Sequence, residues 1–102
     1  MADRIEDLGR EALIAFETLS ESPEARTHEV MAGAVRCLVR MRDHLIEEQR
    51  RNGGNGATQE NLVRLNSILS MAVGAAYPLV GIRPERLHMT RDALRDFLQQ
   101  TG

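Results

Sequence analysis

The chain has 102 residues, the size of a single domain, and a formal net charge of −2 at pH 7. All 13 basic residues are arginine, and the slightly acidic balance argues against a nucleic-acid-binding protein, because contacts to phosphates require a basic surface. Apolar residues make up 42% of the chain and aromatic residues only 3%, which suits packed helices better than strands, so we expect one all-α domain over residues 1–102.

The first two expected helices cover residues 4–20 and 23–51. Ser22 is expected to be the N-cap of the second helix and Pro23 its first residue. The apolar stripe of the second helix repeats with 3-4-3-4 spacing and consists of Met31, Ala34, Leu38, Met41 and Leu45. A helix of about 29 residues is about 43 Å long, so we expect it to protrude from so small a domain or to pair with another chain.

The third expected helix, residues 58–76, is capped by Thr58. It follows a loop, residues 52–56, whose glycines and asparagines favour the end of a helix over a phosphate site. The apolar stripe of the third helix consists of Leu62, Leu65, Leu69, Ala72 and Ala76. From Ser67 onward almost nothing is strongly polar, so we expect this half of the helix to be buried on nearly all sides.

Pro78 ends the third helix, and the fourth is expected over residues 84–99, with a break near Met89 and Thr90. Together the segments predict an antiparallel hairpin of two long helices flanked by N-terminal and C-terminal helices, a four-helix arrangement. Both long helices have apolar faces wider than one neighbour requires. We therefore expect the chain to form a homodimer.

The chemical motifs of common helical bundles are incomplete in this chain. A di-iron bundle uses two Glu-x-x-His motifs, and the chain has one, at Glu85 and His88. His28 lacks the nearby Lys-Gly typical of a phosphorylated histidine. We therefore expect no enzyme, no cofactor and no metal. A metal-binding or phosphotransfer bundle that uses His28, His44 or His88 is kept as an alternative.

The surplus apolar surface predicts a binding role. The residues expected to contact a partner or a second copy are Leu62, Leu65, Leu69, Val73, Leu79 and Ile82, together with Met31, Leu38, Met41 and Leu45. The leading hypothesis is a small non-enzymatic regulatory protein that binds and sequesters a partner protein. A chaperone or assembly subunit of a secretion or phage system is the alternative, because it would use the same surfaces.

A resemblance to a known type supports the first hypothesis. The segment that carries it is Asn66-Ser67-Ile68-Leu69-Ser70-Met71, followed by apolar residues and a proline. In size, in its two long helices and in this segment, the chain resembles the small all-helical quorum-sensing antiactivators of the TraM and QslA type. The resemblance covers the layout of residues 25–82. It implies a dimer that binds a LuxR-type transcription activator and keeps it from acting on DNA.

The sequence also predicts the compartment. The single cysteine, Cys37, excludes an internal disulfide and lies in an apolar run, so we expect a buried core residue in a reducing environment. Residues 1–15 lack the features of a signal peptide. The longest apolar stretch, residues 68–80, is too short and too interrupted to span a bilayer. We expect a cytoplasmic protein.

Overall fold

The computed structural model describes residues 5–51, 53, 56–76 and 84–101. Every regular element in these residues is helical, which confirms the predicted fold class. The elements are α1 (Ile5–Glu21), the short 3-10 helix η1 (Pro23–Ala25), α2 (His28–Arg51), α3 (Gly56–Ala76) and α4 (Pro84–Thr101).

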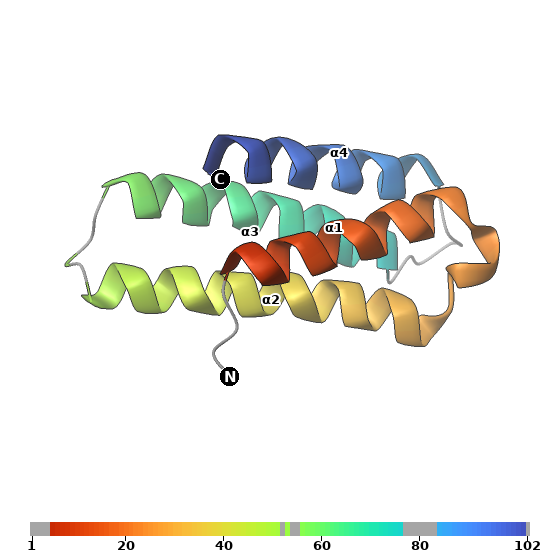
Figure 1. Ribbon diagram of the computed structural model, residues 1–102, viewed down its shortest axis with the longest axis horizontal. Coiled ribbons are helices and arrows are strands. Elements are labelled where there is room, and N and C mark those ends of the chain that lie inside the picture. Colours follow the sequence, from red (N-terminus) through yellow and green to blue (C-terminus); the bar gives the residue numbers. More distant parts are fainter. Residues whose placement is uncertain (1–4, 52, 54–55, 77–83, 102) are drawn as a thin grey trace.

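The four α-helices form an up-down-up-down bundle. Successive helices run in opposite directions (Figure 1). Helix α1 packs against α2 and α4, and α3 packs against the same two helices, so the four helices surround a single core. The predicted hairpin of two long helices with a helix on either flank is therefore confirmed.

The α2–α3 hairpin extends beyond the other two helices. Figure 1 shows the end of α2 and the start of α3 lying beyond the start of α1 and the end of α4. Helix α2 has 24 residues, so it is about 36 Å long in a molecule whose longest dimension is 43 Å. The expected protrusion is thus observed, and the flanking helices leave one end of the hairpin uncovered.

The start of α2 differs from the prediction. Residues Pro23–Ala25 form only the single turn η1, and α2 begins at His28. Ser22 makes no side-chain cap hydrogen bond. Instead, the backbone N–H of Val30 donates to Oγ1 of Thr27 at 3.2 Å. Thr27 is therefore the N-cap of α2, because its hydroxyl accepts one of the backbone N–H groups that lack a helical partner.

The hydrogen bonds of Arg26 account for the interruption between η1 and α2. Its Nε donates to the carbonyl of Leu19 at 2.8 Å, and its Nη2 donates to the carbonyl of Ser20 at 3.2 Å. These carbonyls belong to the last turn of α1, where no helical N–H is available. In a continuous helix over residues 23–51, the side chain of Arg26 would not reach the carbonyls of Leu19 and Ser20.

Two smaller predictions are also corrected. Helix α3 begins at Gly56, two residues before the expected cap, and Thr58 is buried inside it. Helix α4 is continuous through Thr90, whose hydroxyl donates to the carbonyl of Arg86 at 2.8 Å. Because that bond satisfies the buried hydroxyl within the helix, no break is needed.

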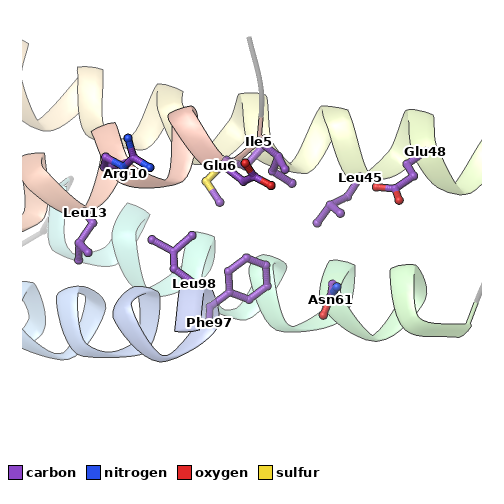
Figure 2. Close-up of a pocket in the computed structure, with 10 residues that line it drawn as sticks. Ile5, Glu6, Arg10, Leu13, Leu45, Glu48, Asn61, Phe97 and Leu98 are labelled. Carbon is purple, nitrogen blue, oxygen red and sulfur yellow. The ribbon is translucent and has the colours of Figure 1, made fainter. Parts of the chain in front are cut away.

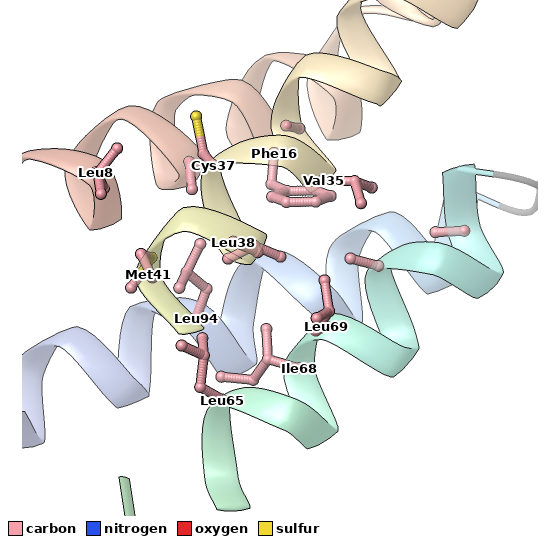
Figure 3. Packing of buried hydrophobic residues seen from close by; sticks show 14 of the residues in the cluster. Leu8, Phe16, Val35, Cys37, Leu38, Met41, Leu65, Ile68, Leu69 and Leu94 are labelled. Carbon is pink, nitrogen blue, oxygen red and sulfur yellow. The ribbon is translucent and has the colours of Figure 1, made fainter. Parts of the chain in front are cut away.

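The core lies between all four helices (Figure 3). Its largest fully buried side chains are Phe16, Leu19, Leu38, Met41, Leu65, Leu87, Leu94 and Thr90. Burial of each large aliphatic side chain contributes about 1.5–3 kcal/mol to folding. The 3-4-3-4 stripes of α2 and α3 therefore face the centre of one chain.

Candidate partner-binding surfaces

Most of the predicted contact residues are core residues. Six of them are at most 8% exposed: Met31, Leu38, Met41, Leu45, Leu65 and Leu69. They pack among the helices of the same chain, and of the six only Met41 and Leu45 also line a groove that opens to solvent. The assignment of Met31, Leu38, Leu65 and Leu69 is corrected because α1 and α4 supply the apolar partners that the width of the α2 and α3 faces requires.

The remaining four predicted contact residues have different positions. Val73 is 43% exposed, and Leu62 is half-buried against the core. Leu79 and Ile82 lie outside the described residues. Val73 is therefore the predicted contact residue that the described structure presents most clearly to solvent.

A groove opens at the end of the bundle where α1 begins and α4 ends, and where the hairpin extends beyond both helices. Its volume is about 660 Å³. All four helices line it: α1 with Ile5, Glu6, Arg10 and Leu13, α2 with Met41, Leu45 and Glu48, α3 with Asn61, and α4 with Phe97 and Leu98. Figure 2 shows Ile5 and Leu45 on one side and Phe97 on the other.

Gly9 of α1 packs closely against Leu98, one of the residues that line this groove. A Cβ on Gly9 would lie 2.5 Å from Cδ2 of Leu98 and 3.3 Å from Cε of Met41. Only glycine lets α1 approach α4 this closely without displacing Leu98, which itself lines the groove. The glycine is thus a packing feature of the wall, and no positive φ angle is involved.

The groove has an apolar floor and a charged rim. Met41, Leu45 and Phe97 are buried core side chains that form part of its lining. Glu6 and Glu48 carry carboxylates on the side opposite Asn61 (Figure 2). With this floor and rim, the groove is suited to apolar side chains that make polar contacts at its edge.

The outer face of α3 is the second candidate surface. Val63 is 58% exposed, and Ser67 and Ser70 are also exposed. Helix α3 has no charged residue from position 65 to its end at Ala76. The expectation that this half is buried on nearly all sides is therefore corrected, since one side faces solvent although its composition resembles that of a buried helix.

Helix α4 adds to the outer face of α3. Met89 is 59% exposed. A hollow of about 230 Å³ lies between the two helices and is lined by Ser70, Met71, Gly74, Arg86 and Met89. Ser70, Met71, Gly74 and Met89 extend the uncharged surface of α3 across the seam to α4, and the guanidinium of Arg86 lies beside them.

The described titratable groups do not have the geometry of a metal site. No group of three or more His, Cys, Asp or Glu side chains within the described ranges could hold a metal ion. Burial, with a smaller contribution from nearby Glu11, raises the pKa of the Cys37 thiol. Cys37 is 8% exposed, so the prediction of a buried core cysteine is confirmed, and the raised pKa disfavours the thiolate form.

No family model, curated protein or solved structure matches the chain significantly. Among the described helices, none is both long enough and apolar enough to cross a membrane. The resemblance to quorum-sensing antiactivators therefore stays a prediction, and the function has to be argued from the two surfaces.

Sequence reasoning missed several residues of these surfaces. Glu6, Arg10 and Leu98 line the groove because of where α1 and α4 end, and local patterns do not predict that relative position. Gly9 offered a signal, since a glycine within an amphipathic helix often marks a close approach. Met89 offered another, because it lies outside the apolar stripe of its own helix.

Proposed function

We propose that the protein is a non-enzymatic regulator that binds another protein and sequesters it. The observation that carries this proposal is the open groove between α1 and α4, whose floor consists of core side chains and whose volume is about 660 Å³. Grooves of this kind bind one apolar face of a partner helix or a few large side chains, while charged residues at the rim fix the orientation.

A LuxR-type transcription activator is the partner that we propose. The support is the resemblance of residues 25–82 to small helical antiactivators, together with the long-helix hairpin that the bundle contains. The groove opens at the end of the bundle where the hairpin projects, so a partner bound there contacts both the hairpin and the flanking helices.

Two adjacent residues of α1 provide a matched test. Leu13 lines the groove and is half-buried, whereas Ile14 is 57% exposed and is not part of the groove lining. Leu13→Arg introduces a charge into the groove, and Ile14→Arg introduces the same charge on the free side of the helix. Circular dichroism of both variants controls for folding.

The measurement is the affinity of the purified protein for a LuxR-type activator and the repression of an activator-dependent reporter. We expect the wild-type protein and Ile14→Arg to bind and repress, and Leu13→Arg to bind at least about tenfold more weakly. Absence of binding by the wild-type protein would reject the proposed partner. Equal loss in both variants would reject the groove.

A further inference from the structure

The outer face of α3 has a stripe with the spacing of a helix-packing face. The stripe consists of Glu60, Val63, Ser67, Ser70 and Gly74, which again follow 3-4-3-4 spacing. The first four are exposed and Gly74 is half-buried. None of the five residues lines the groove between α1 and α4. The stripe is therefore a separate surface from the one on which the proposed function rests.

The two ends of this stripe carry opposite charges. Glu60 provides a carboxylate at one end. At the other end, Nη1 of Arg86 lies 3.5 Å from the position that a Cβ would have on Gly74, so the guanidinium of Arg86 stands directly beside Gly74. Neither side chain forms an ion pair with another residue that the structure describes.

We propose that the outer face of α3 packs antiparallel against the same face of a second copy of this chain. In an antiparallel pair centred on Ser67, position 60 of one helix lies opposite position 74 of the other. Glu60 of each copy then meets Arg86 of the other, about 10 Å along the helix on either side of the centre. The two ion pairs are identical because the two-fold axis of the dimer relates them.

The middle of the stripe favours a second copy over an unrelated charged partner. Ser67 and Ser70 are uncharged and small, so two helices approach there without like-charge repulsion and without burying a charge. Val63, 58% exposed, and Met89, 59% exposed, supply apolar area beside this contact. The resulting dimer leaves a groove open on each copy, and in this respect it goes beyond the proposed function.

A charge exchange tests the pairing. Light scattering over a range of micromolar concentrations gives the dimer dissociation constant of the wild-type protein, Glu60→Arg, Arg86→Glu and the double variant. Each single variant places two like-charge pairs in the interface, so we expect a loss of at least about tenfold in dimer affinity. The double variant restores the ion pairs in reverse, and we expect it to recover the wild-type value to within about threefold.

Asp43→Arg on the outer face of α2 is the control, because it makes the same kind of change on an exposed position outside the stripe. We expect it to dimerise like the wild-type protein. A wild-type chain that is monomeric at these concentrations overturns the proposal. So does a dimer that tolerates both single variants, or a double variant no better than the worse single one. If Glu60→Arg binds the activator with wild-type affinity, the groove functions independently of the outer face of α3, and failure of the dimer proposal would not count against the proposed function.

Discussion

The outward faces of α2 and α3 differ although both helices belong to one hairpin and face the same core. The exposed residues of α2 include Arg36, Arg40, Asp43, Glu47 and Arg50. Arg50 pairs with Glu47 at 3.5 Å. The outer face of α3 carries Val63, Ser67 and Ser70 in place of charges. The outer face of α2 is therefore charged and partly ion-paired, and α3 has no such face along its second half.

The difference shows that the amino-acid composition of an outer face indicates whether that face is suited to water. The structure of a single chain shows only which side chains its own helices cover. The inner faces are equivalent, since Leu38 of α2 and Leu65 of α3 are both fully buried. The outer face of α2 is suited to solvent. An outer face without charges, as on α3, is suited to contact with another protein surface.

The largest expected effect tests the equivalence of the inner faces. We expect Leu38→Ala and Leu65→Ala each to lower the free energy of unfolding by about 2–5 kcal/mol, because each leaves a cavity in the shared core. Urea denaturation at one fixed protein concentration measures this change. Arg36→Ala on the outer face of α2 is the control and should shift the free energy by less than about 0.5 kcal/mol. A core variant that shifts it no more than the control would contradict the packing.

An intermediate effect tests the beginning of α2. We expect Thr27→Ala to destabilise the protein by about 1 kcal/mol, because its hydroxyl accepts the hydrogen bond from Val30. Ser22→Ala removes only an exposed hydrogen bond to Glu24, so its effect should be a few tenths of a kcal/mol at most. Thermal unfolding of both variants compares the two residues. If Ser22→Ala lost more stability than Thr27→Ala, the result would instead support Ser22 as the N-cap and Pro23 as the first residue of the helix.

The smallest expected effect tests the charged face of α2. Glu47→Ala removes an exposed pair with Arg50, so we expect a loss below about 0.5 kcal/mol. The loss should disappear in 1 M salt, where the Debye length is about 3 Å. Urea denaturation at low and high salt makes this comparison. A loss that persists at high salt would mean that Glu47 acts through packing instead of charge.

The 3-4-3-4 stripes predicted the core well, because the inward face of a helix is a local property of spacing. The start of α2 was not predictable in the same way, since it depends on the Arg26 side chain, which donates to carbonyls of α1 six and seven residues earlier instead of following a helical spacing. The second half of α3 was misassigned for a different reason. An uncharged face such as that of Ser67 and Ser70 suits contact with either its own chain or a second chain. Its composition therefore does not predict which of the two covers it.

The groove was the least predictable feature. It depends on where α1 and α4 end relative to the hairpin, and on the contact between Gly9 and Leu98. Both are consequences of the packed bundle. The sequence contains the residues, but only their arrangement in space brings Glu6, Glu48 and Asn61 around one opening.

The most direct test of the claim about α3 is a symmetric disulfide between two copies. In a Cys37→Ala background, Ser67→Cys places one thiol at the centre of the proposed antiparallel contact, where two Cβ atoms approach closely enough to be bridged. Asp43→Cys in the same background places a thiol on the charged face of α2. We expect mild oxidation at micromolar concentration to link most of the Ser67→Cys protein into dimers and to leave Asp43→Cys monomeric on a non-reducing gel. A Ser67→Cys protein that stays unlinked, or an Asp43→Cys protein that links equally fast, would contradict the assignment of the outer face of α3 as an interface.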